Sequence, residues 1–195
     1  MPFNTTMLIG EAFGQSHSFV VSILVHIGIG TLPILFYGTE EQKEKYLPKL
    51  GSVEYLSAYA LTEPNAGSDV AAIAATARRE GDAYVLNGEK MWISLATKAD
   101  HALVVARTDP DAPDPHNGLS AFIVEIDRPG VSTGDIHGKL GVRAGSTGWI
   151  AFQDVEIPNE NRLGEEGEGF RIAMSCLDNG RYTVAAGATG LIRAS

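Results

Sequence analysis

The sequence has one cysteine and no excess of basic residues, and each shortage excludes a class of protein. A single cysteine among 195 residues, Cys176, cannot form a disulfide within the chain, so the composition fits a reducing compartment. The absence of a Cys-x-x-Cys pair or a His/Cys cluster predicts that the chain holds no metal. With 24 acidic and 15 basic residues the formal charge is −9, which argues against nucleic-acid and anionic-membrane partners, because both bind through basic patches.

The sequence also lacks an uninterrupted apolar run that could cross a bilayer. Residues 19–36 are largely apolar, but His26, two glycines and Pro33 interrupt them. A membrane helix needs about 20 apolar residues without such breaks. No signal or transit peptide pattern precedes the run. We therefore expect no membrane span, and we interpret the run as a buried helix that ends at the glycines Gly28 and Gly30.

The apolar spacing is helical at first and then becomes that of strands. Thr39 with Gln42 three residues later predicts a helix N-terminus, and Pro48 predicts where that helix ends. From about residue 57 short apolar runs alternate with turn signals. They predict a turn at residues 81–82, a second turn at the Asn87-Gly88 pair, a separate strand over 91–94, and buried strands over 101–108 and 119–126. Helical spacing returns near the C-terminus.

These patterns predict an α+β chain of several domains. We expect the end of an N-terminal helical domain over residues 1–56. A central antiparallel β domain follows over residues 57–160, and the start of a C-terminal helical domain covers residues 161–195.

Residues 59–69 form the stretch where we expect chemistry. An apolar strand leads there into a polar turn, because Pro64 cannot donate to a ladder and Gly67 tolerates positive φ. The hydroxyls of Thr62 and Ser68 and the nearby backbone N–H groups can converge on an oxygen-rich ligand such as a pyrophosphate. On the residues alone, an ordinary surface turn explains this stretch as well.

Two runs about one hairpin apart carry a family resemblance. Residues 59–69 read Tyr-x-Leu-Thr-Glu-Pro-x-Ala-Gly-Ser-Asp, and residues 84–94 read Tyr-x-Leu-Asn-Gly-x-Lys-x-Trp-Ile-Ser. A Val-Glu-x-Pro run within residues 152–164 and the pair Gly169-Phe170 follow in order, and the match extends to residues 32–50 and 177–191. Together these segments resemble the acyl-CoA dehydrogenases over about residues 30–195.

The resemblance implies a non-covalent FAD and the conversion of an acyl-CoA thioester to a trans-2-enoyl-CoA. It also implies transfer of electrons to an electron-transfer flavoprotein and assembly as a homodimer or homotetramer. The location would be the bacterial cytoplasm or, in a eukaryote, the mitochondrial matrix. The implied FAD-binding positions are Tyr59, Leu61, Thr62, Gly67, Ser68, Trp92, Ile93 and Ser94. The implied substrate-binding positions are Ser68, Asp178 and Arg181.

Within that set, Trp92 would pack against the flavin ring and Ser94 would lie near its N5 atom. Without the family, a tryptophan in a strand is more often a core residue. Arg181 would then be a surface cation paired with Asp178. One departure concerns the flavin edge, since Leu95 follows Ser94 where family members usually have asparagine.

The catalytic base has no candidate in this sequence. Some family members place a glutamate where this chain has Gly180, and the nearby Asp178 is too short to replace it. We therefore expect the base beyond Ser195, and we interpret the 195 residues as an incomplete protomer that is inactive alone. Two alternatives stay open, namely a flavin oxidase or monooxygenase of the same fold that uses oxygen, and a non-catalytic fragment that serves as a binding module.

Overall fold

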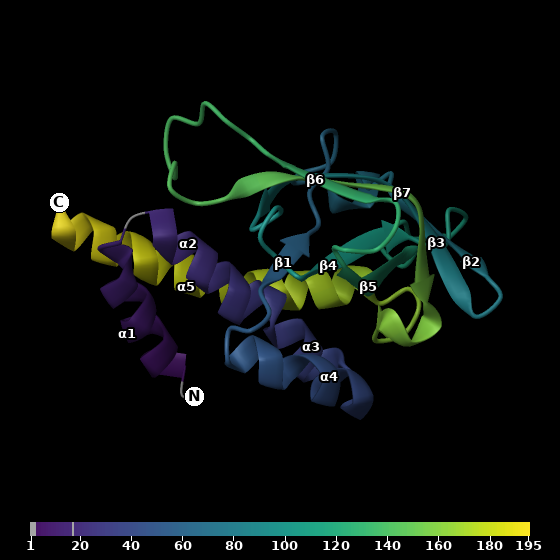
Figure 1. Cartoon of the computed structure of the whole chain (residues 1–195), viewed down its shortest axis with the longest axis horizontal. Helices are drawn as coiled ribbons and strands as arrows, with labels where there is room; N and C mark the ends of the chain where they lie inside the picture. Colours follow the sequence, from purple (N-terminus) through teal and green to yellow (C-terminus); the bar gives the residue numbers. More distant parts are fainter. Residues whose placement is uncertain (1–2, 17) are drawn as a thin grey trace.

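The structure, a computed structural model, describes residues 3–16 and 18–195. Short helices lie at one end of the molecule, a β-sheet lies at the other, and one long helix runs along both (Figure 1). The helices are α1 (Phe3–Gly14), α2 (Ser18–Leu24), the π-helix η1 (Val25–Gly30), α3 (Leu32–Tyr37), α4 (Glu40–Gly51) and α5 (Gly169–Ala194). The strands are β1 (Ser57–Ala60), β2 (Thr76–Glu80), β3 (Ala83–Ser94), β4 (His101–Arg107), β5 (Leu119–Glu125), β6 (Val131–Asp135), β7 (Thr147–Pro158) and β8 (Arg162–Leu163), with 3₁₀ turns η2 (Val70–Ala72) and η3 (Asn159–Asn161).

The eight strands form one sheet in the order β6-β7-β3-β2-β4-β5-β8, with β1 paired to β4. Most pairs are antiparallel, whereas β1 and β2 each pair with β4 in parallel. The first six residues of β4 and of β5 are buried, because both strands lie inside the sheet and helix α5 packs against them. The α+β class with a central, mainly antiparallel sheet is therefore confirmed, as are the strands over residues 101–108 and 119–126.

The predicted turn at Asn87-Gly88 is wrong. The turn at residues 81–82 does connect β2 to β3, but β3 then continues for 12 residues through Asn87 and Gly88 and includes residues 91–94. The long strand β7 pairs along β3, with a bulge between Leu86 and Gly88. At this bulge the Asn87 side chain forms hydrogen bonds with Asp154. Gly88 has φ +139°, and a Cβ there would overlap Ala75. The pair therefore serves a bulge and a close approach of two backbones rather than a turn.

The glycines Gly28 and Gly30 do not end the helix. The chain passes through them as the π-helical turn η1, so residues 18–37 form one helical segment that is long and apolar enough to cross a membrane by length and composition alone. A core helix passes the same test. Here His26 is buried and bonds to Leu50 O at 3.1 Å and Ser57 N at 3.3 Å. A Cβ at Gly30 would clash with Ser57, so this glycine permits close packing on β1. Only 39% of the apolar segment is buried, so the interpretation as a buried helix is confirmed only in part.

Helix α4 begins as predicted but ends later. Thr39 and Gln42 form a reciprocal capping box, with Gln42 N donating to Thr39 Oγ1 at 3.2 Å and Thr39 N donating to Gln42 Oε1 at 3.0 Å. Pro48 lies inside the helix, which continues to Gly51. A proline removes one helical N–H donor and crowds the carbonyl four residues earlier, which disturbs the preceding turn without having to end the helix.

Helix α4 is tied to the sheet by Glu125, at the end of β5. This carboxylate accepts hydrogen bonds from Tyr46 at 2.5 Å, Lys45 at 2.9 Å, Arg128 at 2.7 Å and Asn161 at 2.9 Å. Burial raises the pKa of Glu125, but the hydrogen bonds from Tyr46, Lys45 and Arg128 outweigh burial and lower the pKa to about 2. Glu125 therefore stays ionised and joins the helical end of the molecule to the sheet.

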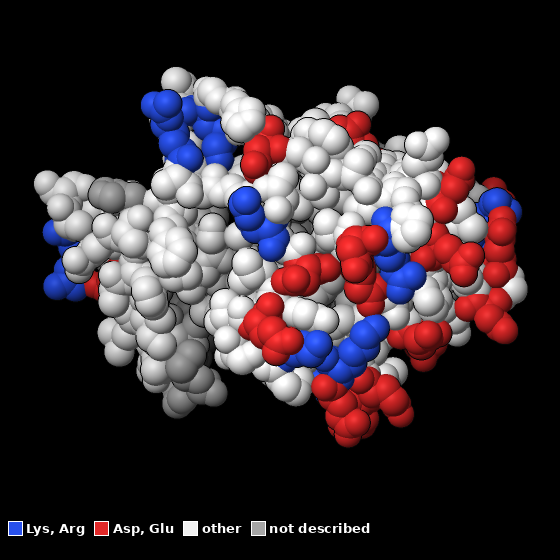
Figure 2. Space-filling view, in the orientation of Figure 1, with Lys and Arg blue, Asp and Glu red and all other residues white. Residues whose placement is uncertain are grey.

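Acidic side chains gather over α4 and around the β2–β3 end of the sheet on the face drawn in Figure 2; some basic groups lie among them, and others lie apart on the loop between β6 and β7. This face has no broad basic patch. The expectation that nucleic acid is not a partner stays a prediction.

Candidate functional site

A cleft of about 400 Å³ lies where the turn after β1, the end of β3, the π-helix η1 and helix α5 meet. Its volume is within the range of small-molecule sites. Every cofactor position implied by the sequence lines this one cleft, although the two runs that supply them are far apart in the chain. The lining residues are Val25, Ile29, Tyr59, Leu61, Thr62, Gly67, Ser68, Val70, Trp92, Ile93, Ser94, Met174, Leu177 and Arg181.

A β-bulge turns Trp92 out of the core and into the cleft. Met91 pairs with Trp149 on β7, Ile93 pairs with Gly148, and Trp92 between them has no partner. Trp92 has φ 63°, a left-handed conformation that is strained for a bulky residue, and its side chain is 59% exposed. Regular alternation would have placed Trp92 on the buried face with Lys90. The bulge shifts the phase, so that Ile93 is buried and the indole is free to contact a ligand.

The turn after β1 presents unused hydrogen-bonding groups. Glu63 and Ala66 bond to each other through their backbones, and Met91 N donates to Thr62 O at 2.8 Å, which holds the turn beside the end of β3. The hydroxyls of Thr62, Ser68 and Ser94 have no hydrogen-bond partner among residues 3–16 and 18–195. An exposed aromatic ring with several free hydroxyls around it fits a flavin, which needs a stacking surface and polar donors at its edges.

A buried ion pair lies under this turn. The Lys90 ammonium is 2.7 Å from Glu63 Oε1 and donates to Leu61 O at 3.0 Å. Glu63 also accepts from the backbone N–H groups of Ala74 at 2.7 Å and Ala75 at 3.0 Å. Burial lowers the pKa of Lys90 to about 8, while the charge and hydrogen bond of Glu63 oppose that shift.

Helix α5 supplies the opposite wall of the cleft. Met174, Leu177 and Arg181 lie at spacings of three and seven residues, which places them on one helical face. Tyr59 anchors this wall because its hydroxyl donates to Ala173 O at 3.2 Å, and burial raises the pKa of this phenol well above its ordinary value. The sequence interpretation missed Met174 and Leu177, although their helical spacing relative to Arg181 was available as a signal.

Two of the implied substrate positions line the cleft, and one does not. Ser68 and Arg181 are part of the lining, whereas Asp178 is absent from it. Asp178 and Arg181 form an exposed ion pair, with 2.5 Å between Asp178 Oδ1 and Arg181 Nη1. The roles given to all of these residues stay predictions.

The backbone conformation at Leu95, the position after Ser94, suits asparagine better than leucine. Its φ is 67°, in the left-handed region that asparagine adopts far more readily than leucine. Its N–H donates to Ser146 O at 3.0 Å, so the loop before β7 holds the chain in this conformation. Leucine is retained here with its side chain buried, and burial of an apolar group offsets part of the backbone strain.

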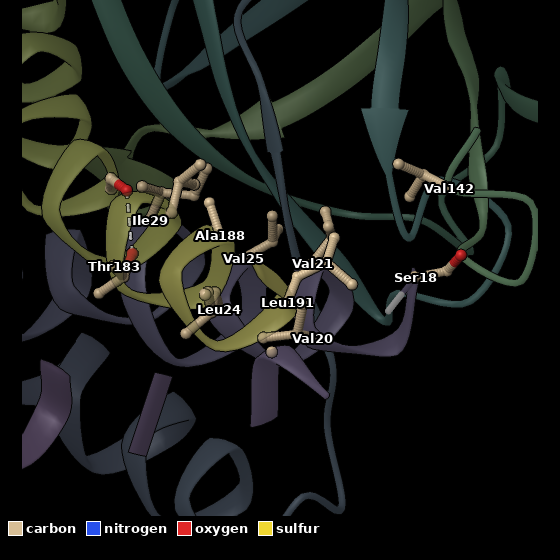
Figure 3. Close-up of a pocket in the computed structure, with 14 residues that line it drawn as sticks. Ser18, Val20, Val21, Leu24, Val25, Ile29, Val142, Thr183, Ala188 and Leu191 are labelled. Carbon is tan, nitrogen blue, oxygen red and sulfur yellow. Dashed lines mark hydrogen bonds between the residues drawn. The ribbon is translucent and has the colours of Figure 1, made fainter. Parts of the chain in front are cut away.

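A second cleft, of about 340 Å³ and almost wholly apolar, adjoins the first. The two share Val25 and Ile29 on η1. In Figure 3 aliphatic side chains of α2 and η1 lie against Ala188 and Leu191 of α5, with Val142 at one end. Thr183 directs its hydroxyl to Gly180 O at 3.0 Å, so that hydroxyl is already bonded. Neither lining includes an Asp or Glu among the described residues, and the described ranges contain no cluster of His, Cys, Asp or Glu that could hold a metal ion.

Comparison with known proteins gives consistent matches. The family described as "Acyl-CoA dehydrogenase, middle domain" matches residues 58–155, and "Acyl-CoA dehydrogenase, N-terminal domain" matches residues 1–54. A probable acyl-CoA dehydrogenase of Bacillus subtilis (strain 168) is 47% identical over 188 residues, which cover 95% of this chain and 31% of that protein.

Two solved structures are similar over nearly all of this chain. The acyl-CoA dehydrogenase from Geobacillus kaustophilus has a TM-score of 0.96 at 42% identity, covering 100% of this chain and 51% of that one. The acyl-CoA dehydrogenase complexed with FAD from Bacillus anthracis has a TM-score of 0.88 at 46% identity, covering 94% of this chain and 32% of that one. The chain thus spans about a third to a half of the length of these relatives.

Proposed function

Because this chain belongs to the acyl-CoA dehydrogenase family, we propose that it is part of an enzyme that binds FAD non-covalently and dehydrogenates an acyl-CoA thioester. The product would be a trans-2-enoyl-CoA, and the electrons would pass to an electron-transfer flavoprotein. The observation that carries this proposal is the convergence of the turn after β1 and the bulged end of β3 on one cleft.

The residues of that cleft divide the work of holding a flavin. The exposed indole of Trp92 offers a stacking surface, and the free hydroxyls of Thr62 and Ser94 can donate to the polar edge of the ring. Gly67 leaves room for a close approach, since no atom lies within 4 Å of the position a Cβ would take, and Ser68 beside it can donate to a phosphate or to the substrate. FAD bound here would accept the hydride that leaves Cβ of the thioester.

The apolar cleft supplies a place for the acyl chain. It adjoins the polar cleft through Val25 and Ile29, so a thioester near the flavin could extend its tail between α2 and α5. Covering apolar surface there contributes about 25 cal/mol per Å². Val142 lies at one end of this cleft, and we propose that the loop between β6 and β7 influences the accepted chain length.

The proton at Cα needs an acceptor that the described residues do not place in either cleft. Gly180 lines the apolar cleft without a side chain, and Asp178 forms its ion pair outside the polar one. A general base has to come within about 3 Å of the proton it removes. We therefore propose that the base comes from outside residues 1–195, in accord with the fraction of its relatives that this chain spans.

Assembly as a homodimer or homotetramer is also proposed. On α5, Val184 is 62% exposed and Ile192 is 76% exposed, and uncovered apolar side chains favour association. Gly190, on the same helix, instead packs against α1 of this chain, because a Cβ at Gly190 would overlap the Glu11 carbonyl of α1. Light scattering that found a monomer for the full-length protein would reject this part. The proposed location is the bacterial cytoplasm or the mitochondrial matrix.

The experiment starts with the full-length protein reconstituted with FAD. We expect it to retain the flavin and to lose its visible flavin absorbance when mixed anaerobically with acyl-CoAs of short, medium or branched chain. The 195-residue chain tested in parallel should show no turnover. Steady release of hydrogen peroxide in air would favour the oxidase alternative. Failure of the full-length protein to bind FAD would reject the proposal and favour a binding module.

A further inference from the structure

We propose that the buried Lys90–Glu63 pair is a positioning element that holds the turn after β1 in register with the Trp92 bulge, and thereby sets the affinity and electronic environment of the flavin. This inference rests on the proposed function. Neither residue lines the cleft, so neither is expected to touch the cofactor.

The pair occupies the junction between the two halves of the cleft. Lys90 lies two residues before the bulged Trp92, and its ammonium donates to the carbonyl of Leu61, which lines the cleft. Glu63 lies one residue after Thr62 and receives that same ammonium. The Lys90 ammonium thus joins the end of β3 to the turn after β1, and it lies behind the side chains that line the cleft.

The carboxylate extends this connection to a third segment. Through the N–H groups of Ala74 and Ala75, Glu63 also fixes the chain that follows η2 and leads into β2. Val70 of η2 lines the cleft as well. Movement of Glu63 would therefore disturb the turn, the bulge and η2 together.

Global stability is a weak explanation for such a pair. Lys90 is 0% exposed and Glu63 is 7% exposed, so both charges lose most of their hydration. Well-packed apolar residues often replace a buried ion pair without loss of stability. Directional charged bonds to a carbonyl and to two backbone N–H groups do specify one geometry, which an apolar contact does not. The feature specified here is the relative position of Leu61, Thr62 and Trp92.

The test uses the full-length protein with three variants. Lys90→Met removes the cation and leaves Glu63 buried without it, whereas Lys90→Met with Glu63→Gln leaves no buried charge. Glu125→Gln is the matched control, because it removes a carboxylate with several donors that does not line the cleft. For each protein we would measure the FAD dissociation constant, the midpoint potential and visible spectrum of the bound flavin, and the Tm of the apoprotein.

We expect FAD to bind at least about tenfold more weakly to both Lys90 variants, with a changed flavin spectrum and potential, because small misplacements of binding groups are costly. The double variant should have a Tm near that of the wild type. Glu125→Gln should lower the Tm and leave FAD affinity unchanged. Wild-type affinity and spectrum in the double variant would overturn the proposal, as would failure of both Lys90 variants to fold. If the wild type itself did not bind FAD, the proposed function would be rejected first, and this proposal with it.

Discussion

Replacement of Trp92 by alanine should weaken FAD binding without destabilising the apoprotein. A tryptophan side chain offers up to about 250 Å² of surface. With 59% of Trp92 exposed, about 150 Å² is open to a ligand, and stacking on one face would cover about half of it. At about 25 cal/mol per Å² this contact contributes about 2 kcal/mol. We therefore expect the dissociation constant to rise by about 25-fold, since about 1.4 kcal/mol corresponds to a factor of ten.

The assay is a flavin fluorescence titration of the full-length apoprotein, with the Tm measured in parallel. An exposed side chain contributes little to folding, so the Tm of Trp92→Ala should stay close to that of the wild type. Phe122→Ala is the matched control, because Phe122 is a buried aromatic residue of β5 that packs against Tyr84, away from the bulge, and does not line the cleft. That variant should lose about 3 kcal/mol of stability and keep its FAD affinity. A Trp92→Ala protein with wild-type FAD affinity and absorbance would refute the stacking role.

Three further outcomes can be measured. The folded pKa of Glu125 is about 2 against an ordinary 4.5, so its contribution is present above pH 4.5 and lost as the pH falls toward 2. Glu125→Gln should therefore lower the free energy of unfolding by about 2 kcal/mol at neutral pH, after a discount for partial exposure. In urea unfolding the variant should also lose less stability than the wild type as the pH falls from 4.5 toward 2, and an equal loss would contradict this. Gly190→Ala should lower the free energy of unfolding by about 2 kcal/mol, because its Cβ would overlap Glu11. Gly28→Ala has open space around it and should be neutral or stabilising in thermal melts. Equal effects of the two changes would count against the α1–α5 contact. Arg181→Gln should raise KM for acyl-CoA with little change in Tm, because its exposed ion pair contributes little, and an unaltered KM would remove Arg181 from the substrate site.

The sequence alone determined much of this protein because its local signals agree with its fold. The Thr39 capping box, the turn at residues 81–82 and the apolar runs of β4 and β5 each depend on neighbouring residues, and the structure confirms them. The family resemblance also depends on contiguous segments, because residues 59–69 and 84–94 contain most of the sequence-predicted residues that line the cleft. Residues whose role depends on one stretch of chain can be recognised in that stretch.

The tertiary structure decided the features that need a partner strand or helix. Asn87-Gly88 is a common turn sequence, but pairing with β7 keeps it inside a strand. Trp92 would be a core residue by alternation, and only the register between β3 and β7 turns it into the cleft with φ 63°. The Lys90–Glu63 pair spans 27 residues of sequence, so no local pattern announces it. Such outcomes depend on which backbone groups find hydrogen-bond partners across the sheet, and that is settled only when distant segments pack together.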